Sequence, residues 1–308
     1  MKTQLFAKRL KRLVPFWLKH LEQRIEAREF SIDTLRAYRW AVSRFLLGLG
    51  DQPITPDVIL AWKADVIKNG YRASSVNEML SGIRSFFTVL VSAAKIPFNP
   101  VQAIRNVQRR STPLRHSRQP LTDNEVRKLL AQPDRETVRG KRDYAILTLM
   151  LYTGARSVEV YRADLIDLQM QSGKLVLLVQ GKSQLEKDAV LVLLGEAKTA
   201  MEAWLEVRGD QPGALFISVG YHNRKGRLSR TEMKRRIKEY FACAGVHDKR
   251  KTVHSLRHTA ITNAIRHHAP FEKLRGMSRH ATLAALMVYY HETDRIDDPA
   301  ERYIDYGE

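Results

Sequence analysis

The chain has 308 residues, 44% of them hydrophobic, which is enough for two domains of ordinary size with a core each. Its net charge of +19 and pI near 10.1 favour a polyanionic partner, nucleic acid first and an anionic membrane surface second. A single cysteine, Cys243, excludes an internal disulfide and a cysteine-based zinc site, and we expect it to be buried on a helix. No apolar run approaches the ~18–20 residues that span a bilayer, and the basic N-terminus lacks the apolar stretch of a signal peptide. We therefore expect a soluble, cytoplasmic protein without a membrane partner.

The first part of the chain is the more basic and has a helical pattern throughout. Residues 1–118 hold 21 Lys and Arg against 8 Asp and Glu, which suits contacts with the phosphate backbone of DNA. Apolar residues spaced three and four apart predict helices over residues 10–25 and 56–68. They predict a further helix that Ser31 caps and that stops at Gly48–Gly50, and another that starts at Ser74 or Ser75 and is ended by residues 95–100. We predict a bundle of four or five helices that binds DNA, over residues 1–108. Its arginines are either DNA contacts or solvated surface charges: Arg36, Arg39, Arg44, Arg72 and Arg84.

The helical pattern breaks over residues 109–120. No apolar periodicity survives there, and Pro113 and Pro120 oppose a helix. Arg109 and Arg110 begin the segment and are further candidate DNA contacts. We predict a basic linker, which is either a strap that wraps a duplex or a plain spacer.

The helices of the second domain, over residues 121–308, have clear start signals. Thr122 and Glu125 have the spacing of a capping box, as do Ser229 and Glu232 ahead of a strongly basic helix. Between these two starts, residues 142–151 predict an apolar helix.

Strands of the second domain are predicted from runs rich in leucine and β-branched residues. Residues 174–180 and 189–194 predict a β-hairpin with Lys182 near its turn, and residues 215–218 predict a further short strand. The fold class is therefore mainly α, with an N-terminal helical bundle followed by a mixed α/β domain that is mostly helical and has a small β-hairpin sheet.

Histidine and arginine residues precede a tyrosine near the end of the chain. His254 and Arg257 are three residues apart and so share one face of a helix. His280 follows from a separate turn, and Tyr289 lies nine residues beyond it. Converging His and Arg donors suit a phosphate, and a nearby phenol suits a nucleophile. The first hypothesis is therefore phosphoryl transfer.

These residues resemble the tyrosine recombinases, the phage-type integrase family. The matching elements occur in the family's order: Thr153-Gly154-Ala155-Arg156 with Glu159, Gly181-Lys182, His254-x-x-Arg257, His280 and Tyr289-x-His291. Lys182 follows Arg156 by 26 residues, as in the family's pattern. The first domain, with Thr34-x-x-x-Tyr38 and Asn99-Pro100, is similar to that family's core-binding domain, so the resemblance covers nearly the whole chain.

The resemblance implies covalent catalysis by Tyr289. Its phenol attacks the scissile phosphate, forms a 3′-phosphotyrosyl link and releases a 5′-hydroxyl. A neutral phenol is a poor nucleophile, so His254 is expected to accept its proton, and Lys182 to protonate the leaving 5′-oxygen.

The resemblance also implies how the phosphate is held. Arg156 and Arg257 clamp its non-bridging oxygens, because a planar guanidinium fits two oxygens at once. His280 donates a further hydrogen bond, and Glu159 orients Arg156 from behind. These cations supply the charge that nucleases often take from Mg²⁺, so neither a metal nor another cofactor is expected.

Three neighbouring residues compete for these roles. Lys187 is a second lysine in the same loop as Lys182. Tyr290 is a second phenol, but on a helix it points about 100° away from Tyr289, so both cannot reach one phosphate. His258 is expected to pack or to face DNA rather than to act in catalysis.

The sequence departs from the family's pattern beside His280. The family usually has a glycine before this histidine and a pair of threonines a few residues after it, whereas this chain has Arg279 before it and Ala284-Ala285-Leu286 after it. An arginine there either disturbs the backbone turn or adds a contact to the phosphate.

These features together predict a site-specific DNA recombinase that exchanges strands through a four-way junction, in the integration or excision of a mobile element or a related reaction. The resemblance implies double-stranded recombination sites as partners, and a homo-tetramer on DNA that is a monomer or weak oligomer when free. It leaves room for an accessory directionality factor and implies a prokaryotic, phage or mobile-element protein associated with the nucleoid. Residues 292–308 either dock on a neighbouring protomer, fold back in cis or stay disordered. Two other classes remain, a type IB topoisomerase and a non-catalytic DNA-binding module.

Overall fold

The structure is a computed structural model that describes residues 5–50, 52–108, 118–180, 186–187, 189–220, 226–280 and 282–289. The chain divides into two compact units, residues 1–112 and 113–308, and each has a hydrophobic core of its own. Most of the predicted linker and all of the predicted tail lie outside the described residues. None of the described helices has the length and the apolar content needed to cross a bilayer.

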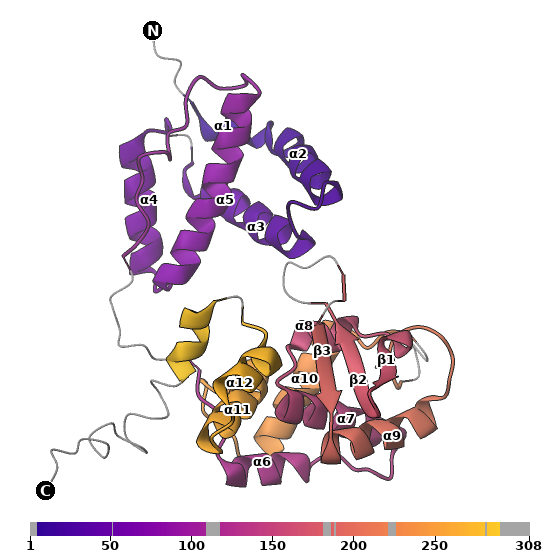
Figure 1. The fold of residues 1–308 in the computed structure, drawn as a ribbon. Helices are drawn as coiled ribbons and strands as arrows, with labels where there is room; N and C mark the ends of the chain where they lie inside the picture. Colours follow the sequence, from indigo (N-terminus) through magenta and orange to yellow (C-terminus); the bar gives the residue numbers. More distant parts are fainter. Residues whose placement is uncertain are drawn as a thin grey trace, which may run out of the picture. The chain divides into compact units, whose positions relative to one another are not determined.

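The described part of the first unit is a bundle of helices (Figure 1). They are α1 (Ala7–Lys11), α2 (Val14–Glu26), α3 (Ile32–Gly48), α4 (Pro56–Lys68) and α5 (Ala73–Ser92). The single helix predicted over residues 10–25 is wrong in one respect, because the chain turns between α1 and α2. Pro15 lies in the first turn of α2, where its missing N–H costs no hydrogen bond.

Aromatic residues form the core of this bundle. Trp17 meets Phe86 edge to face with 5.4 Å between ring centroids, and Phe45 meets Trp62 in the same way at 5.1 Å. α5 lies against α2, α3 and α4, so its buried side supplies the centre of the unit (Figure 1).

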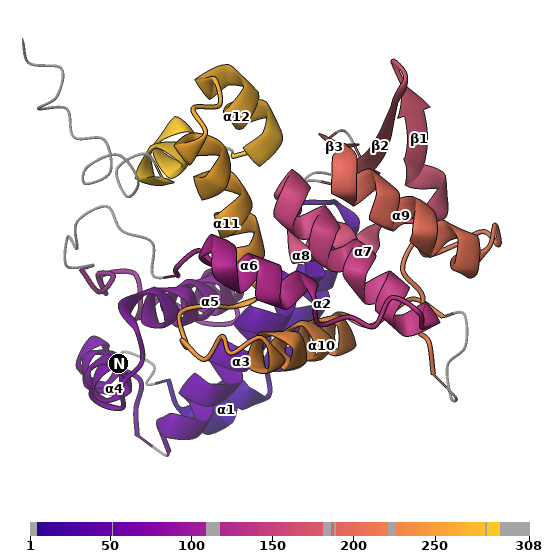
Figure 2. The ribbon, with the colours of Figure 1, turned by 90° about the horizontal axis from the view of Figure 1, so that it is seen from below.

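The second unit is mostly helical and contains a small antiparallel sheet. Its helices are α6 (Asp123–Leu130), α7 (Val138–Thr153), α8 (Ser157–Arg162), α9 (Gly195–Arg208), α10 (Arg230–Cys243), α11 (Val253–Arg266) and α12 (Phe271–Ser278), with a 3₁₀ turn η1 (Leu165–Asp167). Its strands are β1 (Leu168–Gln171), β2 (Lys174–Val179) and β3 (Ala189–Leu193), in the order β1-β2-β3. Residues 283–289 form a last helical segment, which lies beside α11 and α12 in both views (Figures 1 and 2).

The sheet contains the predicted hairpin and one strand more. β2 and β3 pair with Leu177 opposite Leu191, and β1 adds the third strand through a turn at Ser172–Gly173. The strand predicted at residues 215–218 is wrong. Its backbone bonds to several separate partners, Ala163 among them, and makes only isolated bridges.

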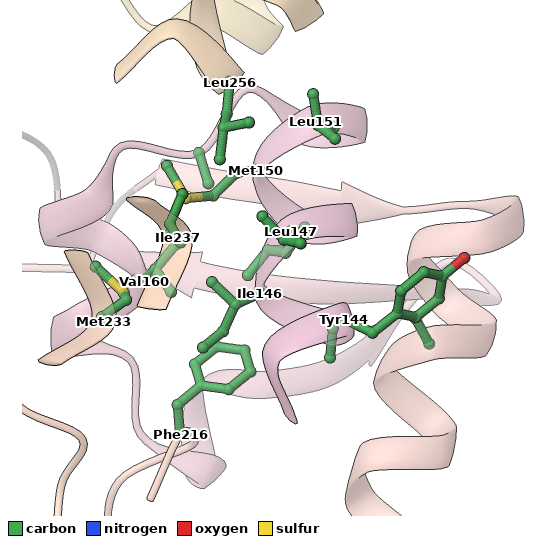
Figure 3. Close-up of a cluster of buried hydrophobic side chains, with 14 of the residues drawn as sticks. Tyr144, Ile146, Leu147, Met150, Leu151, Val160, Phe216, Met233, Ile237 and Leu256 are labelled. Atoms are coloured by element: carbon green, nitrogen blue, oxygen red, sulfur yellow. The ribbon is translucent and has the colours of Figure 1, made fainter. Parts of the chain in front are cut away.

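Helix α7 is the central element of the second unit. Figure 3 shows Ile146, Leu147 and Met150 of α7 facing Met233 and Ile237 of α10. α7 also packs against α9 and α11, so it is surrounded by neighbours and its C-terminal end is held in place. That end begins the candidate site.

The helices start at the predicted cap residues, whereas the predicted burial of Cys243 is not found. Thr122 and Glu125 form both bonds of the capping box, from Glu125 N to Thr122 Oγ1 at 3.2 Å and from Thr122 N to Glu125 Oε2 at 2.8 Å. Ser229 caps α10 by accepting from Glu232 N at 3.1 Å, which is one of the two bonds of the capping box predicted there. Cys243 is the last residue of α10 and is exposed, so the expectation that it is buried is wrong.

Candidate active site

The corner between α7 and α8 sets the position of Arg156. α7 ends at Thr153, and its C-cap Gly154 has a φ of 64°, a left-handed backbone conformation that glycine adopts without a steric penalty. A Cβ at this position would lie 3.3 Å from Cε of Met277, so space also favours glycine. α8 begins directly after, with Arg156 as its N-cap and Glu159 in its first turn. The Thr-Gly-Ala-Arg sequence is therefore a tight corner that leads into Arg156.

Glu159 binds both the main chain and the side chain of Arg156. Its Oε2 accepts from Arg156 N at 2.7 Å, and its Oε1 accepts from Arg156 Nη1 at 2.8 Å. The Glu159 side chain is fully buried. Burial alone would raise the pKa of Glu159, but the charge of Arg279 and the hydrogen bonds from Arg156 outweigh it and lower that pKa. Glu159 is therefore an ionised, buried partner of Arg156.

Arg257 reaches the same corner from α11. Its side chain is buried, Nη1 donates to Gly154 O at 2.6 Å, and Nη2 donates to Ser278 O. Burial and the charges of Arg156 and Arg279 lower the pKa of the Arg257 guanidinium below its ordinary value. A buried cation next to two others is stabilised by an anion, and a phosphate diester is the anion that the sequence predicts here.

Arg279 takes the left-handed position that ends α12. Its φ of 51° and ψ of 40° are those of a glycine-type helix cap, so the turn before His280 is present despite the arginine. A non-glycine residue pays about 1–2 kcal/mol for this conformation. The side chain is 10% exposed and points inward, where Nη2 donates to Glu159 Oε2 at 2.9 Å. The Arg279 carbonyl in turn accepts from Arg156 Nη2 at 2.8 Å.

Tyr289 is buried beside two histidines at the end of the last helical segment. Its side chain is 3% exposed, and its ring centroid lies 4.6 Å from that of His258 and 5.5 Å from that of His280. It is also close enough to Arg257 for their charges to interact. The structure therefore gathers Tyr289 and His280 near the arginines of α8 and α11.

The two histidines of α11 have different surroundings. His258 is buried, and its Nδ1 lies 3.4 Å from Thr262 Oγ1. His254 is exposed in the first turn of α11, just after the N-cap Thr252. His258 therefore packs on the tyrosine, whereas His254 lies at the surface.

The two candidate lysines of the hairpin are separated by their surroundings. Lys182 lies outside the described residues. Lys187 is tied to Asp164 at 2.9 Å and to Asp167 at 2.5 Å, at the base of the connection between β2 and β3. Burial lowers the pKa of Lys187, but hydrogen bonds to Asp167 and Asp164 outweigh it, and the net pKa is raised. Lys187 is thus an anchored cation and a poor proton donor.

The site has an excess of positive charge. Arg156, Arg257 and Arg279 carry three positive charges against the single negative charge of Glu159. Within the described ranges, no three His, Cys, Asp or Glu side chains gather closely enough to hold a metal ion. Fixed guanidinium groups in a partly enclosed place can bind a phosphate and stabilise charge that develops on it.

Comparison with known families decides the class of this protein. The profile of the phage integrase family matches residues 119–295, more than half of the chain, and that of the phage integrase N-terminal SAM-like domain matches residues 17–94. The chain belongs to the phage integrase family. It is a tyrosine recombinase, an enzyme that cuts and rejoins DNA. The family and the fold class predicted from the sequence are confirmed.

Relatives of this recombinase match it over most of their length. It is 29% identical over 275 residues to tyrosine recombinase XerC of Thermodesulfovibrio yellowstonii, which covers 85% of this chain and 86% of that protein. It is 29% identical over 242 residues to tyrosine recombinase XerD of Pseudomonas putida, with 75% and 74% covered.

Solved structures share the fold of the recombinase. The XerH recombinase in a post-cleavage complex with its difH substrate has a TM-score of 0.69 at 16% identity, over 93% of this chain and 84% of that one. A lambda integrase tetramer bound to a Holliday junction has a TM-score of 0.67 at 18% identity, over 99% and 81%. At such identities the likeness concerns the fold.

The arginines predicted to contact DNA differ in their surroundings. Arg84 is half-buried and donates to Ile104 O at 2.5 Å and to Asn106 Oδ1 at 2.9 Å, so it ties the last segment of the bundle to α5. Arg44 is exposed and lies 5.9 Å from the ring centroid of Trp40. The remaining candidates are either exposed (Arg36, Arg39, Arg72) or outside the described residues (Arg109, Arg110).

Sequence reasoning missed two features of the recombinase site. Arg279 contacts Glu159, which lies 120 positions earlier in the chain. Lys187 is bound to the carboxylates of Asp164 and Asp167, which lie 23 and 20 positions upstream. The sequence signal for the first was the arginine at a glycine position. For the second the only signal was a pair of aspartates, Asp164 and Asp167, which resembles many helix caps.

Proposed function

We propose that this recombinase cuts DNA through Tyr289, with the arginines of α8 and α11 as the phosphate clamp. The observation that carries the proposal is the fixed placement of Arg156 and Arg257 around one corner, with Arg257 within electrostatic range of a buried tyrosine. The Tyr289 oxygen would bond to phosphorus while the bond from phosphorus to the 5′-oxygen breaks. The products are a 3′-phosphotyrosyl link and a free 5′-hydroxyl, and attack by a 5′-hydroxyl of another strand reverses the step.

The clamp acts on the charge that grows in the transition state. Arg156 and Arg257 are held by Glu159, by Gly154 O and by two further carbonyl groups, so they need little reorganisation when the phosphate arrives. Preorganised donors of this kind contribute a factor of about 10²–10³ each to the rate.

Proton transfer needs an acceptor for the phenol proton and a donor for the leaving oxygen. We assign the acceptor role to His254, which is exposed at the start of α11, and a hydrogen bond to the phosphate to His280. We assign the donor role to Lys182. Lys187 is less suited to it, since its ammonium is bound to two carboxylates.

The wider reaction is strand exchange between two double-stranded recombination sites in the cytoplasm. We propose a tetramer on DNA and a four-way junction, in line with the lambda integrase tetramer that is bound to a Holliday junction. Energy is conserved in the covalent link, so the scheme needs no ATP. Arg156, Arg257 and Lys182 supply the positive charge that nucleases often take from Mg²⁺, so the scheme includes no metal. A type IB topoisomerase would share this cleavage chemistry but would relax supercoils without paired sites.

A suicide-substrate assay tests the proposal. Nicked duplexes from the DNA that flanks the gene are incubated in EDTA with wild type, Tyr289→Phe and the adjacent control Tyr290→Phe. We expect a covalent protein–DNA adduct from wild type and from Tyr290→Phe, and none from Tyr289→Phe. Loss in Tyr290→Phe alone would move the nucleophile by one residue. Relaxation of a plasmid that lacks paired sites would favour the topoisomerase, and absence of any adduct would favour a DNA-binding module.

A further inference from the structure

Three successive carbonyl groups at the end of α12 are bound by three different guanidinium groups. Met277 O accepts from Arg279 Nη1, Ser278 O from Arg257 Nη2, and Arg279 O from Arg156 Nη2. The left-handed backbone at Arg279 turns the chain directly after these carbonyls. The turn that presents His280 is thus fastened to both arginines of the proposed clamp, and Arg279 is part of the fastening.

The Arg279 side chain also shares a carboxylate with Arg156. Glu159 Oε2 accepts from Arg156 N at 2.7 Å and from Arg279 Nη2 at 2.9 Å, while Glu159 Oε1 accepts from Arg156 Nη1 at 2.8 Å. A second bond from Arg279 Nη2 reaches Gly154 O at 3.3 Å, the same carbonyl that holds Arg257. Arg279 therefore contacts Glu159, which holds Arg156, and Gly154 O, which holds Arg257, and its guanidinium group is surrounded by protein atoms.

The arginine is kept at this place despite two unfavourable features. It holds a left-handed conformation that suits glycine, and its Nε is buried with no acceptor among the described residues. Contacts with Glu159 and with two carbonyls offset these features in the folded state. These contacts of Arg279 fix the position of Glu159 and, through it, that of Arg156.

Electrostatics gives this arrangement a consequence for the reaction. With Arg279 present, the four groups Arg156, Arg257, Arg279 and Glu159 carry a net charge of +2. With glycine in its place the net charge would be +1, and Glu159 would cancel most of the charge of Arg156. The attacking phenolate and the phosphate diester together bring two negative charges, so the higher positive charge favours the transition state over the bound substrate.

We infer that Arg279 is a positioning residue for DNA cleavage, which holds Glu159 and the turn at residues 277–279 so that Arg156 stays oriented and keeps its charge for the phosphate. This inference rests on the proposed function of the clamp. Arg279 acts through Glu159 and Arg156 and does not touch the phosphate. Its removal should therefore slow cleavage and leave DNA binding nearly unchanged.

Single-turnover cleavage of the nicked substrate, at saturating protein, measures this effect. We expect Arg279→Gly to cleave about 10–100-fold more slowly than wild type, with a Kd for DNA within a factor of about three. This loss is smaller than the factor of about 10²–10³ for removal of a donor itself, because Arg279 acts through Arg156. The matched control is Arg275→Gly, which removes the same charge from an exposed position of α12 and should cleave at the wild-type rate once bound.

Chemical rescue separates positioning from a general structural role. Ethylguanidinium added to Arg279→Gly can fill the space beside Glu159, and we expect it to restore the cleavage rate at least about fivefold while leaving Arg275→Gly unchanged. Arg279→Lys keeps the charge and should retain more activity than Arg279→Gly. Cleavage by Arg279→Gly within threefold of wild type, or a slow variant that neither ethylguanidinium nor lysine improves, would overturn the inference.

The pairing with Glu159 is tested by a double-mutant comparison. Because Arg279 acts through Glu159, the variant with both Glu159→Gln and Arg279→Gly should cleave no more than about threefold slower than Glu159→Gln alone. Its melting temperature without DNA should exceed the value expected from adding the two single losses, since the double change restores the net charge. Fully multiplicative rates or additive melting temperatures would contradict the inference. Failure of wild type itself to form an adduct would instead remove the proposed function, and the melting temperatures would still test the pairing.

Discussion

Replacing Glu159 by glutamine tests the buried charge arrangement most directly. The substitution keeps the size of the side chain but removes the carboxylate charge that pairs with Arg156 and Arg279. The glutamine amide also places an N–H₂ group where either Arg156 or Arg279 now donates, so at least one donor loses its acceptor. Breaking a buried ion pair by removing one partner costs about 3–5 kcal/mol. We therefore expect the free energy of unfolding of the second unit to fall by that amount.

The measurement is thermal and urea unfolding of the full chain without DNA. For a unit of this size, about 2–4 °C is lost per kcal/mol, so the melting temperature should fall by roughly 6–20 °C. Glu202→Gln is the matched control, because Glu202 is 53% exposed on α9 and lies 3.7 Å from Lys198. It should change stability by no more than about 0.5 kcal/mol. A loss below about 1 kcal/mol for Glu159→Gln would show that the carboxylate does not balance the arginines.

Three further predictions concern pH, the corner and the hairpin. Folding lowers the pKa of Glu159 from its ordinary value of 4.5, so the stability that its charge contributes is present above pH 4.5 and is lost as the pH falls through the lowered pKa. The difference in unfolding free energy between wild type and Glu159→Gln should therefore shrink from pH 5 to pH 3. A constant difference would contradict an ionised Glu159. Gly154→Ala should lose about 1–2 kcal/mol of stability in urea and should also cleave more slowly. The control Gly245→Ala changes another glycine with a left-handed φ, of 77°, and should lose stability only. Equal cleavage rates in both variants would argue against a role of the corner at Gly154. Lys187→Met should lose about 1 kcal/mol of stability in thermal unfolding and should cleave more slowly with unchanged DNA binding. The exposed control Lys174→Met should change neither stability nor cleavage. An unaffected cleavage rate in Lys187→Met would mean that Lys187 does not anchor the hairpin for catalysis.

Local signals in the sequence predicted the helices well. α4 has the predicted bounds, and Thr122 with Glu125 forms the predicted capping box, because apolar periodicity and cap residues act within a few positions of the chain. The break between α1 and α2 was missed, since apolar residues continue across it. β1 was missed as well, because its sequence Leu-Gln-Met-Gln is mostly exposed and has few strand-forming residues.

The candidate site could be predicted only in its side chains. The order of Arg156, His254, Arg257, His280 and Tyr289 indicated the family, and the family is confirmed. The sequence does not reveal which groups hold the arginines, because those groups are largely backbone carbonyls brought together by tertiary packing. It also left two lysines in competition, and only the folded chain brings Asp164 and Asp167 to one of them.

The carbonyl groups at the end of α12 explain why the sequence beside His280 can differ from the family's usual pattern. A carbonyl is present whatever the side chain, so the acceptors at residues 278 and 279 that hold Arg257 and Arg156 stay in place when the side chains there differ. These carbonyl acceptors are dipoles without formal charge. They hold the guanidinium groups and leave their positive charge intact, whereas a carboxylate would cancel it. The backbone of this turn therefore suffices to hold Arg156 and Arg257, and the Arg279 side chain adds the contact with Glu159 to it.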